Sequence, residues 1–445
     1  MKKLATFGSV LVLSGSLGVA ALFASSAPSF AAARSYATGR APISVAMGDL
    51  NGDGKPDLAT ANYEVGVNSV SVLLNSGHGS FRAKRDYRTG RRPSSVAIGD
   101  LNGDGRMDLA TANEAEGVNT VSVLINQGGG SFQSKLDYRT GADPNSVAIG
   151  DLNGDAKRDL ATANWSDDGS STVSVLLNRG DGSFEPKVDY RTQSGADSVA
   201  MGDLNGDGTP DLAIANFGGT VAVLLNTSDG SFQASRDYRT GGAAESIAIG
   251  DLNGDGKPDL ATANENNSVS VLMNSGDSRF RAKHDYRTGE GEAESVAIGD
   301  LNGDGKPDLA TANGNGTVSM LANRGDGSFR ARLDYPIGAG NSLVIGDLNG
   351  DGKLDLATPN ISTNTVAVLL ASTTDACTVP NVRRRTLPAA RRMIARAHCR
   401  VGKIRRDYSK TVKRGRVISE YPKPPTALPN RGKVELVVSR GRRPS

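Results

Sequence analysis

The feature that constrains this chain most is a six-residue string, G-D-L-N-G-D, that occurs seven times. The first Asp of each copy is Asp49, Asp100, Asp151, Asp203, Asp251, Asp300 or Asp347. Successive copies lie 47 to 52 residues apart. A period of this length is typical of stacked repeat units, and it has to be interpreted before any single element.

The second repeat shows what one unit contains. Short runs with strand character, separated by turn residues, lie at 95–99, 109–113, 121–125 and 132–138. No window in the repeats has a convincing helical period. Four strands in each unit predict an all-β fold, a seven-bladed β-propeller in which each unit is one blade.

The two ends of the repeat region predict how the ring closes. Six units continue into an outer strand that ends in Asp-Tyr, whereas the seventh stops at Val366–Leu370. At the other end of the region, Ser35–Gly39 matches Asp86–Gly90 of the first unit. The N-terminal strand is therefore expected to complete the seventh blade, which leaves no open strand edge.

Each repeat carries the loop pattern D-x-N-x-D-x-x-x-D, which predicts a calcium site. Calcium takes six to eight oxygen ligands, and it favours loops that offer them at positions 1, 3, 5, 7 and 9. A backbone carbonyl at position 7 explains why Lys, Arg and Thr all occur there, and Gly at position 6 suits the sharp turn. The predicted ligands are Asp49, Asn51, Asp53, Lys55 and Asp57; Asp100, Asn102, Asp104, Arg106 and Asp108; Asp151, Asn153, Asp155, Lys157 and Asp159; Asp203, Asn205, Asp207, Thr209 and Asp211; Asp251, Asn253, Asp255, Lys257 and Asp259; Asp300, Asn302, Asp304, Lys306 and Asp308; and Asp347, Asn349, Asp351, Lys353 and Asp355.

A polar turn without an ion is the alternative, but it leaves three carboxylates repelling one another in each of seven loops. We therefore expect up to seven Ca²⁺ ions. The third loop differs from the others because Ala156 replaces the glycine of position 6. This costs about 1 kcal/mol of backbone strain and predicts a weaker third site.

The loop pattern separates this chain from other calcium-binding proteins. An EF-hand loop ends in Glu at position 12 and continues into a helix, whereas position 12 is Thr60 in the first loop and the flanking segments are strands. The pattern resembles the FG-GAP/VCBS repeat, which also builds the head of integrin alpha chains. The resemblance covers about residues 35–373 and implies a calcium-loop propeller, here assigned to residues 34–373.

The formal net charge of +3 conceals two opposed parts. Residues 376–445 hold 20 Lys and Arg against 3 Asp and Glu, and the rest of the chain holds 31 against 45. Such a split predicts two domains with different partners.

At the N-terminus, Lys2 and Lys3 precede an apolar run, Leu4–Phe23, and then small residues ending at Ala31–Ala33. This order predicts a signal peptide at residues 1–33, with an uncleaved anchor as the alternative. The mature protein should be extracellular and cell-wall associated, without a membrane span.

The tail is predicted to be a small α+β domain at residues 376–441, with a helix at 388–398 and strands at 417–419 and 434–438. Cys377 and Cys399 are the only cysteines, and export favours a disulfide between them over free thiols. The tail resembles a PASTA domain. It departs from the family pattern after Val382, where Arg383 and Arg384 occupy a place that is often glycine in that family. The resemblance rests on Val379–Val382, Val417–Ser419, Pro422, Leu428–Gly432 and Ser439–Gly441.

A PASTA domain implies association with peptidoglycan or the cell wall. The charge independently predicts binding to a polyanion such as teichoic acid, although a merely soluble basic surface is the alternative. Nucleic acid would bind such a charge, but export removes it as a physiological partner.

Three functions remain open at this stage. The first is a monomeric, non-catalytic, calcium-stabilised propeller that binds an unknown protein or glycan at a bacterial surface. The second is a calcium-dependent lectin with sugar sites between blades, against which the 5% aromatic content counts. The third is an enzyme that cleaves polysaccharides or phosphoesters, but no Ser-His-Asp or Cys-His set can be assembled from three histidines. We therefore predict no catalytic residues and no organic cofactor.

Overall fold

The computed structural model describes residues 28–443 except 115–116, 118, 167–168, 194, 277, 339, 373–376, 398, 425 and 429–432. Residues 1–27, most of the predicted signal peptide, lie outside the described residues. The chain forms two compact units, one of residues 31–370 and one of residues 28–30 with 371–445. In the described part, no helix has the length and apolar character needed to cross a bilayer.

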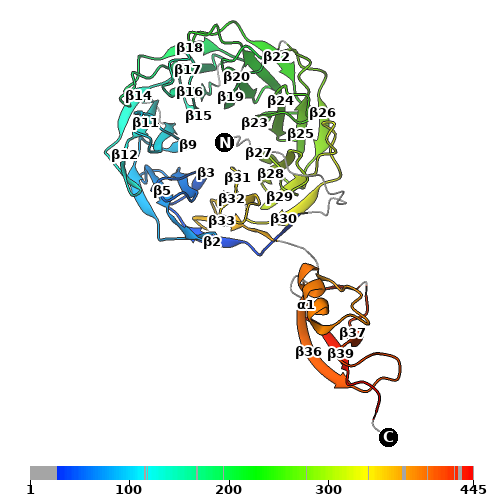
Figure 1. Ribbon diagram of the computed structural model, residues 1–445. Helices are drawn as coiled ribbons and strands as arrows, with labels where there is room; N and C mark the ends of the chain where they lie inside the picture. Colours follow the sequence, from blue (N-terminus) through cyan, green and yellow to red (C-terminus); the bar gives the residue numbers. More distant parts are fainter. Residues whose placement is uncertain are drawn as a thin grey trace. The chain divides into compact units, whose positions relative to one another are not determined.

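The larger unit is a ring of seven four-stranded antiparallel sheets, as the repeats predict. In the first blade, β3 (Pro42–Gly48) lies nearer the axis than β5 (Ser69–Leu73) (Figure 1). The strands of this sheet pair in the order β3, β4 (Asp57–Asn62), β5 and β8 (Arg85–Arg88). The four strands predicted in the second repeat are present, but the fourth predicted segment, 132–138, does not form one strand. Phe132 belongs to a short hairpin, and the outer strand of the blade begins at Leu136.

The other blades repeat this pairing order. Their strands are β9 (Pro93–Gly99), β10 (Asp108–Asn113), β11 (Thr120–Leu124) and β14 (Leu136–Arg139); β15 (Pro144–Gly150), β16 (Asp159–Asn164), β17 (Thr172–Leu176) and β18 (Val188–Arg191); β19 (Ala196–Gly202), β20 (Asp211–Asn216), β21 (Thr220–Leu224) and β22 (Arg236–Arg239); β23 (Ala244–Gly250), β24 (Asp259–Asn264), β25 (Ser268–Leu272) and β26 (His284–Arg287); β27 (Ala293–Gly299), β28 (Asp308–Asn313), β29 (Thr317–Leu321) and β30 (Leu333–Pro336); and β31 (Val344–Gly346), β32 (Asp355–Asn360) and β33 (Thr365–Leu369). Small hairpins pair β6 (Asn75–Gly77) with β7 (Ser80–Phe81) and β12 (Asn126–Gly128) with β13 (Ser131–Phe132).

The seventh blade is completed by β2 (Arg34–Ala37), which pairs with β33 and places Tyr36 opposite Val366. The Tyr36 hydroxyl donates to the Gly79 carbonyl of the first blade (2.9 Å), and its ring lies 5.1 Å from that of Phe81. Tyr87 makes the same two contacts with the second blade. The expected closure is therefore present, and the repeated tyrosine joins neighbouring blades.

Small residues on the inner strands allow the blades to stack closely. A Cβ added to Gly48 would lie 2.8 Å from Ile98 Cγ2 of the next blade, and one added to Gly99 would lie 2.9 Å from Ile149 Cγ2. The interior is close-packed, so a methyl group there would force the sheets apart. This explains why Ala and Gly alternate with Val and Ile in each repeat.

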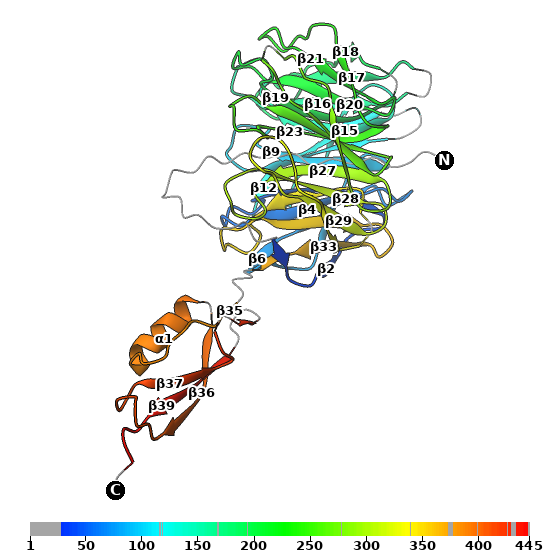
Figure 2. The same ribbon diagram turned by 90° about the vertical axis from the view of Figure 1, so that its right-hand side faces the viewer.

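In the C-terminal unit, β36 (Arg400–Asp407), β39 (Lys433–Ser439) and β37 (Val417–Tyr421) form one sheet, with β36 parallel to β39. Helix α1 (Leu387–Arg396) covers this sheet (Figure 2), is capped by the Thr386 side chain, and buries Ala390 and Ile394. Two short pairs complete the unit, β35 (Cys377–Thr378) with β38 (Ala427–Leu428) and β1 (Ser29–Phe30) with β34 (Ala371–Ser372).

The expected helix and two strands are therefore present in the tail, whereas β36 was not predicted. The predicted last helical residue, His398, lies outside the described residues. Cys399 is buried in the core of this unit, but the side chain of Cys377 lies outside the described residues, so the disulfide stays a prediction. Strand β1 falls within the predicted signal peptide, whose cleavage also stays a prediction.

Candidate metal centres and basic pocket

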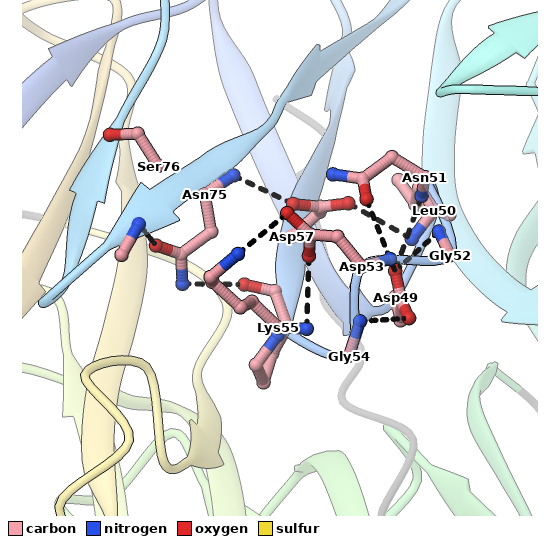
Figure 3. A network of polar contacts seen from close by, with 12 residues as sticks. Asp49, Leu50, Asn51, Gly52, Asp53, Gly54, Lys55, Asp57, Asn75 and Ser76 are labelled. Atoms are coloured by element: carbon pink, nitrogen blue, oxygen red, sulfur yellow. Dashed lines mark hydrogen bonds and ion pairs between the residues drawn. The ribbon is translucent and has the colours of Figure 1, made fainter.

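Each D-x-N-x-D loop connects the first strand of a blade to the second, and its own side chains wind it tightly. In the first loop, the Gly52 and Gly54 N–H groups donate to Oδ1 and Oδ2 of Asp49, each at 2.7 Å (Figure 3). The Asn51 side-chain oxygen accepts from the Asp53 N–H (2.8 Å), and Asp53 accepts from the Lys55 N–H (3.1 Å). The oxygens of positions 1, 3 and 5 are therefore turned into the loop, as the spacing predicts.

The aspartate of position 9 is buried at the base of the loop. Asp57 is 0% exposed, and its two oxygens accept from the Leu50 N–H (3.0 Å) and the Asn75 N–H (2.6 Å). Burial raises the pKa of Asp57 to about 6, two backbone hydrogen bonds oppose the rise, and Asp53 and Asp49 add repulsion. The pKa is about 6 for the same reasons at Asp108, Asp159, Asp211, Asp259 and Asp308.

The donor set of these loops fits calcium. Carboxylate, amide and carbonyl oxygens are hard ligands, and a bound Ca²⁺ offsets the repulsion among three carboxylates. The backbone carbonyl of position 7 is free to coordinate, because in the described residues it accepts no hydrogen bond in any of the seven loops. Calcium binding by these residues remains a prediction, and the loop geometry is consistent with it.

The third loop keeps this geometry despite its substitution. Ala156 adopts φ +65°, close to the φ of +78° at Gly54, and its N–H donates to Asp151 Oδ2 (2.8 Å) as the glycines do. A residue with a Cβ is disfavoured in this left-handed conformation, whereas glycine is not.

Replacing Ala156 by Gly is therefore expected to raise the free energy of unfolding by about 1 kcal/mol and to tighten the third calcium site. Thermal unfolding and calcium titration of the variant check this. Gly54→Ala is the matched control and should have the opposite effect, because no atom lies within 4 Å of the added Cβ and only strain changes. Equal stability of Ala156→Gly and the parent protein would contradict the prediction.

A repeated asparagine, which the sequence analysis missed, links six of the seven loops to the next blade. The Asn126 N–H donates to Asp108 Oδ1 (2.7 Å) within its own blade, and its side chain donates to the Leu50 carbonyl (2.9 Å) in the loop of the preceding blade. Asn75 makes the equivalent bond to Leu348 across the ring closure. The asparagines in this position are Asn75, Asn126, Asn178, Asn226, Asn274 and Asn323.

The sequence contains a signal for these asparagines, because six repeats have Asn two residues after the end of the third strand, where the seventh repeat has Ala371. The hydrogen bonds make six of the seven position-9 aspartates part of the contact between blades. Binding an ion in one loop is therefore expected to stabilise its neighbour as well.

The C-terminal unit contains a basic pocket that sequence reasoning did not locate. It has a volume of about 650 Å³, and its polar lining consists of Arg406, Tyr408, Arg414, Ser439, Arg440 and Arg442. The Arg440 guanidinium lies over the Tyr408 ring, 5.8 Å from its centroid. The pocket lies at the C-terminal ends of β36 and β39, where the parallel pairing brings Arg406 of β36 close to Arg440, which directly follows β39.

Comparison with known proteins agrees with both parts of this description. FG-GAP-like repeats match residues 49–111, 153–214, 203–262, 251–311 and 300–358, and a PASTA domain matches residues 378–440. No curated protein matches the chain.

Two solved structures share the fold, both of BBS1N in complex with ARL6DN, one soaked with lead and one with mercury. Each has a TM-score of 0.54, with 12% and 14% identity over 76% and 78% of this chain and 95% and 97% of theirs. At this identity the likeness shows a β-propeller and nothing about ligands. The chain belongs to the FG-GAP-like repeat family and carries a PASTA domain at its C-terminus.

Proposed function

We propose that this chain is an exported, calcium-binding, non-catalytic propeller that binds a protein or glycan at the bacterial surface as a monomer, while its PASTA domain attaches to a cell-wall polyanion. The family matches support a surface or cell-wall role. The oxygen-rich loops support calcium binding. The proposal includes removal of residues 1–33 and a disulfide between Cys377 and Cys399, which would tie the start of the domain to its buried core.

The observation that carries the attachment is the arginine pocket. Guanidinium groups bind carboxylate and phosphate through paired hydrogen bonds, and several of them around one cavity favour a polyanion. The electrostatic field of the whole tail also favours an anionic ligand, because residues 376–445 carry a net charge of +17. Seven Ca²⁺ ions would change the net charge of residues 34–375, the mature chain before the basic tail, from −16 to about −2. The tail should then dominate the field of the calcium-loaded protein.

Reversing two pocket charges, with Arg406→Glu and Arg440→Glu in the full chain, is expected to weaken sedimentation with purified cell walls at least tenfold. Two reversed charges remove both attraction and paired hydrogen bonds. The matched control is Arg400→Glu with Lys433→Glu, an exposed pair at the opposite end of the same two strands. It changes the net charge equally and should bind more tightly than the pocket variant.

Walls tested before and after removal of teichoic acid distinguish that polymer from peptidoglycan as the ligand. If the pocket variant and the control lose binding equally, net charge alone accounts for attachment. If neither variant loses binding, the PASTA domain is not the attachment site.

A further inference from the structure

A buried acidic side chain lies at the end of the propeller opposite the calcium loops. Glu245 is the second residue of β23, whereas the loop of that blade follows the last residue of the strand. Glu245 is 2% exposed, and neither carboxylate oxygen has a hydrogen-bond partner among the described residues. An ionised carboxylate in such a place is costly unless a cation compensates it.

Two further carboxylates converge on Glu245. One carboxylate oxygen from each of Glu245, Glu265 and Glu292 lies within 4.8 Å of the other two. Glu265 directly follows β24 of the same blade, and Glu292 directly precedes β27 of the next blade. Both are half-buried, so the cluster has a buried base and a side open to solvent.

The surroundings add negative charge to this cluster. Burial, and then repulsion from Glu294 and Asp197, raise the pKa of Glu245 well above its ordinary value. Asn145 donates to Asp197 (2.8 Å) and Asn341 donates to Glu294 (3.2 Å), so amides from neighbouring blades engage these two acids. Among the described residues, no such amide donates to the Glu245 oxygens.

We propose that Glu245, Glu265 and Glu292 hold an additional divalent cation, Ca²⁺, at this end of the ring, separate from the seven loop sites. The ligand spacing fits, because calcium–oxygen bonds of about 2.3–2.6 Å place opposite ligands about 4.8 Å apart. All three ligands are carboxylates, the type that calcium prefers. Three protein ligands leave coordination positions for water or for an oxygen of a bound partner.

Glu245→Gln tests this in the full chain after removal of calcium by a chelator. Equilibrium dialysis against radioactive calcium should find one ion fewer per chain than in the parent protein. Without calcium, the variant should melt at a higher temperature than the parent, because a buried carboxylate has been replaced by a neutral amide. Glu185→Gln, which changes an exposed acid paired with Arg179, should leave the calcium count unchanged.

Glu292→Gln provides a second variant at a half-buried position if Glu245→Gln fails to fold, and it too should lose one ion. An unchanged count in the variants would overturn the proposal and would indicate that Glu245 is neutral and shares a proton with Glu294. The seven loop sites would be unaffected by that outcome. Asp259→Asn removes a predicted ligand from the fifth loop. Its effect on the number of calcium ions bound per chain tests calcium binding by the loops independently of Glu245.

Discussion

Chelating calcium from the purified protein is expected to lower its melting temperature by roughly 20 °C or more. A site filled at a hundred times its dissociation constant contributes about 2.7 kcal/mol, so seven such sites contribute on the order of 19 kcal/mol. Without calcium, three carboxylates repel one another in every loop. The asparagine bonds between blades, such as Asn126 to the Leu50 carbonyl, spread this destabilisation around the ring.

The calcium effect should depend on pH in a defined direction. In the absence of calcium, the folded-state pKa of Asp57 and its equivalents is about 6, above the ordinary 3.8. Their protonation therefore stabilises the apo fold at low pH, and this stability is lost as the pH rises through 6. Calcium needs the ionised carboxylates, so its stabilising effect should be large at pH 8 and small at pH 5.

Differential scanning calorimetry with calcium and with chelator, at both pH values, measures the two effects together. Magnesium at the same concentration is the control, because it demands a more regular geometry and keeps its own water. A melting temperature unchanged by chelation at pH 8 would contradict the calcium assignment of the loops. A calcium effect that is larger at pH 5 would contradict the role of the position-9 aspartates.

Deleting residues 34–37 is expected to destabilise the propeller more than any single substitution outside the loops. Among the described residues, β2 is the only strand of the seventh blade that comes from the N-terminal end of the chain. Its loss exposes the edge of β33 and removes the contacts of Tyr36 with the first blade. An unpaired edge favours aggregation, so chromatography should show oligomers as well as a lower melting temperature.

Two tyrosine variants separate ring closure from loss of an aromatic contact. Tyr36 and Tyr87 make the same contacts with the next blade, and each ring lies 5.1 Å from its phenylalanine. Removing either side chain costs roughly 2–4 kcal/mol of packing. Tyr36→Ala should cost more than Tyr87→Ala, because β2 is held to β33 of its own blade by pairing alone, whereas β8 is also joined to β5 of its blade by the chain. Equal effects would mean that closure adds no stability of its own.

Most of the propeller could be predicted from the repeats, because the sequence patterns that specify a blade are local and recur from one repeat to the next. The turn glycines, the alternating inner strands and the missing strand of the last unit are all local patterns. The extended β36 was not predicted, because its sequence has several charged residues and only Val401 and Ile404 as large apolar ones. It forms because parallel pairing with β39 satisfies its backbone.

The sequence by itself determined the number of blades, the residues of the D-x-N-x-D loops, the closing strand and the charge of the tail. Only the tertiary structure placed Asn126 against Leu50, gathered four arginines around one pocket and brought Glu245 to Glu265 and Glu292. The physical reason is distance along the chain. A local period dictates how each unit folds, whereas contacts between residues of different strands and blades depend on how the folded units pack against one another.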